Sequence, residues 1–401
     1  MTESTEQLKK LEEAFSPSAP ITVKNFFFGR FDHLKEILDA IRERGQHIVV
    51  YGERGVGKTS FANISASSIQ GIFPIKITCN RKDVFKKIWD RAFQRVKFEQ
   101  SKEGMGFIPI ERKESVQLDL FLPDKDDISS IDIQFVLEKV QVRLMFIFDE
   151  FDTIDSGNVI SEMADTIKSL SDNAPHVTIM LVGVGSTISD LIGEHESINR
   201  CLRQVKLPRM SNGELKQILD HGLEHMGFSI DATAEREIIR FSQGFPHFTH
   251  LLGKNACKAC LEDGIEKVGA AELERSISIS VERVDESIRN AYQRGTMTSK
   301  NSDSFKSVVW ACSDAEEDEH GTFKLTDIAA AYSKITKKET KANAIAYHIG
   351  KLCSDERGKI LDKVGTSNNV RYRFRNPLLR AYIQLKRRTI LKLNRRDVKK
   401  S

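Results

Sequence analysis

The 401-residue sequence has no run of 18 apolar residues, the length that a helix needs to cross a bilayer. Its first 20 residues carry four glutamates and lack the apolar core of a secretory signal. Cysteine is sparse, and the six that occur are scattered as is usual for reduced thiols: Cys79, Cys201, Cys257, Cys260, Cys312 and Cys353. These absences predict a soluble, cytoplasmic protein without a membrane partner.

The only close cysteine pair is Cys257 with Cys260, a CxxC. No second pair of ligands accompanies it and no βαβ pattern surrounds it, so buried helix thiols are favoured over a zinc or redox site.

Basic charge is concentrated at one end of the chain. The formal net charge is +4, yet residues 371–401 contain twelve Lys or Arg and a single acidic residue, Asp397. The remainder of the chain is therefore acidic, and any contact with a polyanion is expected near the C-terminal end.

Residues 46–60, QHIVVYGERGVGKTS, join an apolar strand pattern to a glycine-rich loop and a helix. The loop satisfies G-x-x-x-x-G-K-[ST], in which glycines bring backbone N–H groups close to phosphates and the lysine adds positive charge. A threonine hydroxyl can bind Mg²⁺, and the helix presents its positive dipole end. The pattern predicts ATP and Mg²⁺ as cofactors. The expected nucleotide-binding residues are Gly52, Glu53, Arg54, Gly55, Val56, Gly57, Lys58, Thr59 and Ser60.

Residues 144–150, LMFIFDE, read as a buried strand that ends in two acidic residues. Asp149 is expected to hold Mg²⁺ together with Thr59, and Glu150 to orient or deprotonate the attacking water. An ordinary strand leaving the core would explain this segment alone. Paired with the loop, and with Lys58 as a further catalytic residue, it favours ATP hydrolysis.

Strand and helix patterns alternate over residues 21–210, which predicts an α/β fold with a parallel sheet. Residues 98–128 interrupt the alternation as an insertion with a hairpin or an edge strand. Residues 1–20 are expected to form a loosely attached arm with one short helix. Residues 211–295 read as an all-helical lid, opened by a capping box of Ser211 with Glu214 and ending in one long helix over 270–293.

Residues 303–385 contain three helix patterns followed by two short strands around TSNN, which describe a winged helix. Residues 386–401 form a basic tail with eight Lys or Arg.

The order of these motifs resembles the AAA+ branch of the P-loop NTPases, and within it bacterial ATPases of the Orc1/Cdc6 type, over residues 26–385. The segments that carry the resemblance are FFFGR, GERGVGKT, LMFIFDEFD, TIMLVGVGST, INRCLRQVKLPRM, GFPHFTHLLG and the terminal winged helix. The resemblance implies that Ser186 contacts the γ-phosphate, a helix N-cap being the alternative. It also implies that Arg200 is an arginine finger for a neighbouring subunit. Arg203 and Arg209 compete with Arg200 for that role, and a plain surface arginine is the other interpretation.

One position departs from the family pattern, because His247 stands where many lids carry an arginine. The Gly-x-Pro before it resembles the signalling STAND ATPases. Two hypotheses follow. The first is an ATPase that forms homo-oligomers and binds double-stranded DNA through residues 337–401. The second is a switch whose winged helix contacts a protein effector.

Overall fold

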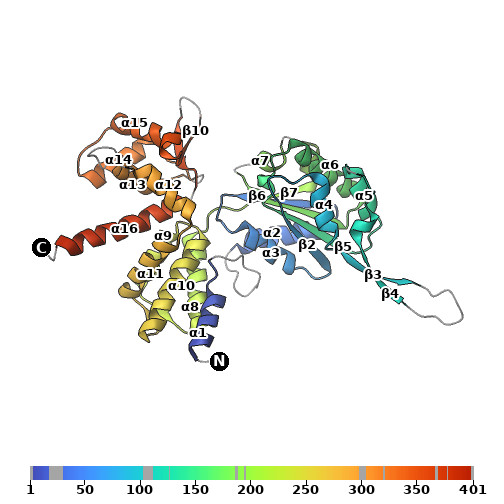
Figure 1. Cartoon of the computed structure of the whole chain (residues 1–401), viewed down its shortest axis with the longest axis horizontal. Helices are drawn as coiled ribbons and strands as arrows, with labels where there is room; N and C mark the ends of the chain where they lie inside the picture. The colour runs from blue at the N-terminus through green and yellow to red at the C-terminus, as the bar shows by residue number, and fades with distance from the viewer. Residues whose placement is uncertain are drawn as a thin grey trace. The chain divides into compact units, whose positions relative to one another are not determined.

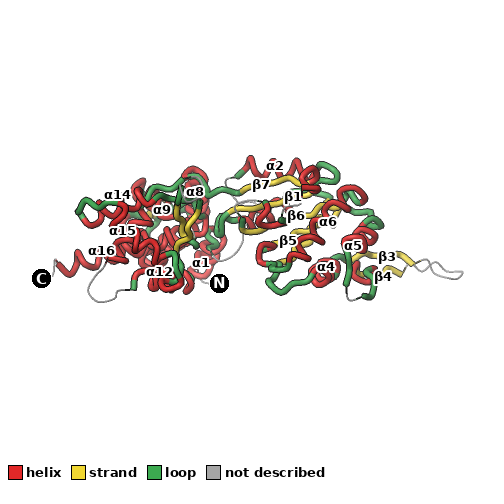
Figure 2. The backbone as a smooth tube through the Cα atoms, turned by 90° about the horizontal axis from the view of Figure 1, so that it is seen from above, coloured by secondary structure: helices red, strands yellow, loops and turns green. Residues whose placement is uncertain are grey.

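The computed structural model describes residues 3–17, 30–102, 112–125, 127–185, 188–193, 196–297, 304–318, 321–365, 369–376 and 378–398. The chain forms two compact units. We call them the sheet unit (Pro20–Pro208) and the helical unit (Met1–Ala19 with Arg209–Ser401). Figure 1 labels their elements, and Figure 2 separates strands from helices by colour. In the described part of the chain, no helix is long and apolar enough to span a membrane.

Five parallel strands form the main sheet, in the order β2-β5-β6-β1-β7. Their bounds are β1 His47–Gly52, β2 Ile72–Thr78, β5 Arg143–Asp149, β6 Val177–Val184 and β7 Leu202–Lys206. β5 is buried along almost its whole length because helices cover both faces of the sheet. β6 lies between β1 and β5, so Gly52 and Asp149 end at the same edge of the sheet.

Helices pack on both faces of this sheet (Figure 1). α2 (Phe31–Arg42) and α3 (Lys58–Ser67) lie on one face, and α4 (Phe85–Phe93), α5 (Ser130–Leu137) and α6 (Gly157–Asn173) lie on the other. The short elements are η3 (Phe151–Thr153), α7 (Ser189–Ile192) and η4 (Glu196–Cys201). The predicted α/β fold with a parallel sheet is confirmed.

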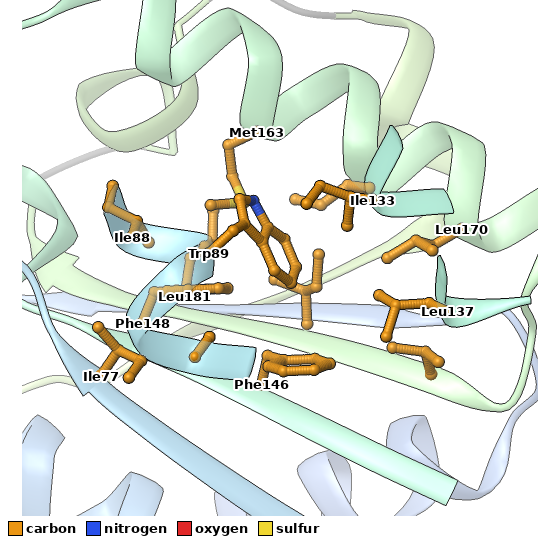
Figure 3. Close-up of a cluster of buried hydrophobic side chains, with 14 of the residues drawn as sticks. Ile77, Ile88, Trp89, Ile133, Leu137, Phe146, Phe148, Met163, Leu170 and Leu181 are labelled. Atoms are coloured by element: carbon orange, nitrogen blue, oxygen red, sulfur yellow. The ribbon is translucent and has the colours of Figure 1, made fainter. Parts of the chain in front are cut away.

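The aromatic side chains of α4 and β5 form the centre of the core. Figure 3 shows Trp89 of α4 lying over Phe146 and Phe148 of β5, with α5 and α6 residues around it. The Trp89 ring centroid lies 5.2 Å from each of these two rings, in edge-to-face geometry. Burial of these rings holds the carboxyl end of β5, and with it Asp149, in place.

The insertion contains a hairpin of β3 (Lys97–Lys102) and β4 (Arg112–Gln117). β4 ends at Gln117, because Leu118–Phe121 form the 3-10 turn η2. Leu118 buries its side chain in the core, and its N–H donates to Val96 O at 3.0 Å. This contact turns the chain back toward the sheet.

The first part of the helical unit contains α8 (Asn212–Met226), β8 (Ser229–Ile230), α9 (Ala232–Ser242), α10 (Pro246–Asp263), β9 (Lys267–Val268), α11 (Ala270–Arg283) and α12 (Glu286–Thr296). The capping box of Ser211 with Glu214 is present at the start of α8. The single helix expected over 270–293 is wrong. Asp285 accepts a hydrogen bond from the Ser287 N–H at 2.7 Å, so it caps a new helix at that point.

The N-terminal helix α1 (Glu3–Ala14) packs against α8 and α10 of the helical unit. Leu11 and Phe15 are fully buried there. The Phe15 ring fills a notch where two helices carry glycine, since a Cβ at Gly222 would lie 2.2 Å from it and one at Gly253 2.5 Å. The expected loose attachment of this arm is therefore wrong.

The C-terminal part contains α13 (Ser304–Asp314), α14 (Leu325–Thr336), α15 (Ala342–Leu352), η5 (Asp355–Arg357), β10 (Leu361–Val364), β11 (Arg371–Phe374) and α16 (Leu378–Val398). β10 and β11 form an antiparallel hairpin. The basic tail expected from residue 386 is the continuation of α16. Arg387 pairs with Asp314, and Arg388 pairs with Glu237 and Glu274, so the first turns of that segment are fixed by ion pairs.

Candidate functional site

A tight glycine loop joins β1 to α3. Gly52 and Gly57 have φ of 154° and 92°, a backbone region that L side chains rarely adopt. Gly52 is also confined, because a Cβ there would lie 2.4 Å from Leu207 O. Val56 is fully buried and anchors the loop in the core. The loop ends at the N-terminus of α3, an arrangement that binds anions in many proteins.

Lys58, the first residue of α3, is a buried cation at this loop. Its Nζ donates to Gly52 O at 3.0 Å and to Glu53 O at 2.9 Å. Burial lowers the pKa of Lys58 to about 8, and the nearby carboxylates of Asp152 and Asp149 oppose this shift. The loop therefore holds a positive charge over its own carbonyl groups.

The structure brings Thr59 and Asp149 together from segments 90 residues apart. Thr59 Oγ1 donates to Asp149 Oδ1 at 3.2 Å. The Glu150 N–H donates to the same oxygen at 3.0 Å, and Lys76 Nζ lies 3.0 Å from Oδ2. Asp149 is 4% exposed, so its charge is balanced inside the protein rather than by solvent.

A hydroxyl and a carboxylate at this spacing are the hard oxygen ligands that Mg²⁺ prefers. Among the described residues, no group of three or more His, Cys, Asp or Glu could hold a metal ion. A cation at this site would therefore depend on Thr59 and Asp149 together with ligands from outside the protein.

Glu150 occupies a left-handed turn directly after β5, with φ of 58°. Its side chain is exposed, whereas Phe151 after it is buried in the core. The turn thus directs one carboxylate away from the sheet while both neighbours stay fixed. This geometry is compatible with a general base, because that group must reach a substrate outside the core.

Three charged residues near this site were not among the predicted ones. Lys76 on β2 contacts Asp149, and its sequence signal is a lone cation in an apolar strand pattern. Arg30 is buried, donates from Nη2 to Pro208 O at 2.7 Å, and is close enough to act on the charge of Lys58. Asp152 accepts from the Val184 N–H at 2.7 Å. For Arg30 and Asp152 the motifs FFFGR and DEFD were the available signals.

Within the described part of the sheet unit, the structure does not bring the residues expected from the family resemblance to the site formed by Lys58, Thr59 and Asp149. Arg200 lies in η4, 66% exposed, with Nη2 2.7 Å from Asp172 Oδ1. Arg203 is exposed on β7. Arg209 belongs to the helical unit, where Nη1 lies 2.6 Å from Glu317 Oε2, so it is engaged within its own chain. Ser186 lies outside the described residues.

His247 takes part in attaching the N-terminal arm. Its Nδ1 donates to Pro17 O at 2.8 Å, and its ring packs edge-on against Phe248. His247 is thus tied to residue 17 in this chain.

A comparison with protein-family models found no match, and a comparison with curated proteins found none. Solved structures do match over nearly the whole chain. A Walker-type ATPase of Pyrococcus abyssi has a TM-score of 0.51 at 15% identity, covering 92% of this chain and 99% of that one. Cdc6p from Pyrobaculum aerophilum has a TM-score of 0.47 at 10% identity, covering 94% and 98%. The Orc1 protein of Aeropyrum pernix in complex with DNA has 0.48 at 12%, covering 95% and 97%.

At these identities the likeness concerns the fold alone. The strand order, the glycine loop between β1 and α3, and the match to the Pyrococcus ATPase define a P-loop NTPase fold for the sheet unit. The expected fold class of the sheet unit is confirmed.

Proposed function

We propose that this protein is an AAA+ ATPase, similar to Orc1/Cdc6 proteins, that binds ATP and Mg²⁺ at residues 52–60 and hydrolyses ATP slowly. The hydrogen bond between Thr59 and Asp149 carries the proposal, because it joins two separate motifs of one phosphate site. Lys58 is buried beside them with its ammonium group over the loop. A chance glycine turn would not be expected to place these three side chains together.

Each residue has a distinct task in this proposal. Mg²⁺, held by Thr59 and Asp149, supplies charge neutralisation on the phosphates. Lys58 exchanges its contacts with Gly52 O and Glu53 O for phosphate oxygens. Glu150, exposed at the carboxyl end of β5, orients and deprotonates the attacking water.

The direct test compares wild-type protein with Lys58→Ala and Glu150→Gln for binding of a fluorescent ATP analogue and for phosphate release. Lys58→Ala is expected to lose binding or hydrolysis. Glu150→Gln is expected to bind with nearly wild-type affinity and to lose at least about 100-fold in kcat, since one general base is removed. Glu138→Gln, an exposed carboxylate after α5, serves as the matched control. Equal hydrolysis by wild type and Glu150→Gln would refute the assignment.

DNA binding is proposed for the C-terminal part, with α13, α14, α15 and the β10–β11 hairpin forming a winged helix. Lys337, Lys338 and Lys341 are exposed around the start of α15 and support contact with phosphates. Four other polar or basic residues of the predicted DNA-binding range 337–401 are engaged within the chain: His348 Nε2 lies 3.1 Å from Ser304 Oγ, Lys351 pairs with Glu356, Arg371 Nε lies 3.0 Å from Asp318 Oδ2, and Arg388 pairs with Glu237.

Salt-dependent anisotropy of a fluorescent DNA duplex tests this part of the proposal. Each lost phosphate contact should flatten the slope of log K against log salt by about 0.9. Lys338→Ala with Lys341→Ala is expected to flatten it by up to about 1.8. Lys139→Ala with Lys168→Ala removes the same charge from exposed positions of the sheet unit and should leave the slope unchanged. Equal slopes for both pairs would refute this DNA site.

A signalling switch of the STAND type is the second candidate. It is favoured by the extent to which the basic residues of α16 are engaged in ion pairs within the chain. It is also favoured by the Gly244-x-Pro246 segment, because Gly244 O accepts from the Met210 N–H at 2.9 Å, two residues after the end of the sheet unit at Pro208. Absence of any salt-sensitive DNA binding by the ATP-bound protein would support the switch.

A further inference from the structure

The turn after β5 contains a carboxylate, Asp152, that has no task in the proposed hydrolysis. This turn is held at three points. Phe151 is buried in the core, Thr153 Oγ1 donates to Glu150 O at 2.7 Å, and the Thr153 N–H donates to the same oxygen at 3.0 Å. The position of Asp152 is therefore fixed by its neighbours on both sides.

Asp152 reaches across to the neighbouring strand. Its Oδ1 accepts from the N–H of Val184, the last residue of β6, at 2.7 Å. The close approach depends on the absence of a side chain at Gly183, where a Cβ would lie 2.8 Å from Asp152 Oδ1 and 3.1 Å from Asp152 N. The turn and the strand end thus form one packed joint.

The end of β6 also contacts the glycine loop. The Gly185 N–H donates to Gly52 O at 3.4 Å, and Gly52 O is one of the two carbonyl groups that hold Lys58 Nζ. Asp152 therefore ties the acidic turn to a strand end that in turn touches the loop. The carboxylate of Asp152 also lies close enough to attract the Lys58 ammonium.

We propose that Asp152 is a positioning residue for ATP hydrolysis, and that its bond to the Val184 N–H sets the end of β6 relative to Glu150. The inference rests on the ATPase activity proposed above. Because β5 and β6 are parallel neighbours, Val184 at the end of β6 and Asp149 just before Glu150 lie at the same edge of the sheet. By fixing both segments, Asp152 keeps the general base Glu150 in position relative to the end of β6. Small misplacements of catalytic groups strongly reduce the rate.

Two substitutions separate the hydrogen bond from the charge. Asp152→Ala removes the acceptor for the Val184 N–H. Asp152→Asn keeps an acceptor oxygen of the same size. For Asp152→Ala, kcat is expected to fall at least about 10-fold while the dissociation constant for the ATP analogue stays within about three-fold. For Asp152→Asn, kcat should recover to within about three-fold of wild type.

The control is Asp155→Ala, which removes an exposed carboxylate three residues along the same segment, where it pairs with Arg81. It should leave kcat and ATP affinity unchanged. Amide hydrogen exchange of the peptide covering 180–185 provides a readout besides activity, and it should speed up in Asp152→Ala but not in Asp152→Asn.

The outcomes separate this inference from the function on which it rests. Wild-type hydrolysis that Glu150→Gln abolishes, together with unchanged kcat in a folded Asp152→Ala protein, overturns the role of Asp152 alone. Parallel loss of ATP affinity and kcat in Asp152→Ala, without rescue by Asp152→Asn, also overturns it. A wild-type protein that neither binds nor hydrolyses ATP overturns both.

Discussion

Arg209 Nη1 lies 2.6 Å from Glu317 Oε2, and this bond links the residue that directly follows the sheet unit to the loop after α13. The other carboxylate oxygen of Glu317 lies 2.5 Å from Arg380 Nη1 on α16. Glu317 is 12% exposed and Arg380 10%, so a single acidic residue balances two largely buried guanidinium groups. Glu317 thereby joins Arg209, the residue that directly follows the sheet unit, to Arg380 on α16.

Loss of the Glu317 carboxylate should destabilise the helical unit. Glu317→Gln leaves Arg380 buried without its charge partner, and removing one member of such a pair costs about 3 kcal/mol. Urea unfolding should show a lower midpoint for the transition of the helical unit. Glu316→Gln, an exposed neighbour, is the control and should change the free energy of unfolding by less than about 0.5 kcal/mol. An unchanged midpoint in Glu317→Gln would show that the ion pairs of Glu317 with Arg209 and Arg380 contribute nothing to stability.

A second prediction concerns the notch that holds Phe15. Gly222→Ala and Phe15→Ala should each destabilise the helical unit, the first by collision and the second by about 3 kcal/mol through a cavity. The double variant should be more stable than the sum of the two effects, because the new methyl group can occupy the space of the lost ring. Gly213→Ala, which meets only Ser211 Oγ at 3.9 Å, is the control. Strict additivity would place Phe15 outside the notch.

The pH dependence of stability should follow two buried histidines. Burial lowers the pKa of His250 to about 4 and that of His47 to about 3, against about 6.5 for an accessible histidine. Between these pKa values and pH 6.5, the unfolded chain therefore binds more protons than the folded protein. The stability that depends on neutral His250 and His47 is complete above pH 6.5, and it is lost as the pH falls toward 4 for His250 and toward 3 for His47. Thermal unfolding at pH 7.5 and 5.5 should show a loss of about 1 kcal/mol for each histidine.

His250 also allows a test by substitution. Neither of its ring nitrogens has a hydrogen-bond partner among the residues that the structure describes. Leucine has a similar volume and needs no partner, so His250→Leu should raise the stability of the helical unit by about 1 kcal/mol and reduce its pH dependence. His221→Leu, at an exposed position of α8, should do neither. Lower stability with an unchanged pH profile in His250→Leu would contradict this explanation.

The last prediction concerns Arg200, whose role as an arginine finger stays a prediction. If Arg200 acts on ATP bound by a second copy, Arg200→Ala should lower kcat about 1000-fold without changing ATP affinity. Mixing it with Lys58→Ala protein should restore part of the activity through hybrid interfaces. Arg42→Ala, which removes an exposed arginine of α2 that pairs with Asp39, is the matched control. A mixture no more active than its two components would exclude the trans role.

Local patterns were sufficient to predict much of this molecule. The conformation of Gly52 and Gly57 and the capping box at Ser211 each depend on only a few neighbouring residues. Both glycines have positive φ and the capping box is present, as expected. The break of the helix at Asp285 was missed because an aspartate N-cap competes with a continuing apolar pattern, and sequence periodicity alone cannot rank the two.

The sequence by itself determined the parallel α/β fold, the glycine loop and the acidic strand end, because strand burial and loop conformation depend on neighbouring residues. Only the tertiary structure decided which charges meet. Lys76 reaches Asp149, Asp152 reaches Val184, and Glu317 joins Arg209 to Arg380. These pairings join residues distant in sequence, and the order of strands and the packing of helices set their distances. The sequence likewise predicts that the cations of α16 are available to DNA, because it does not show which acidic residues lie near them. In the structure, Arg387 pairs with Asp314, and Arg388 pairs with Glu237 and Glu274.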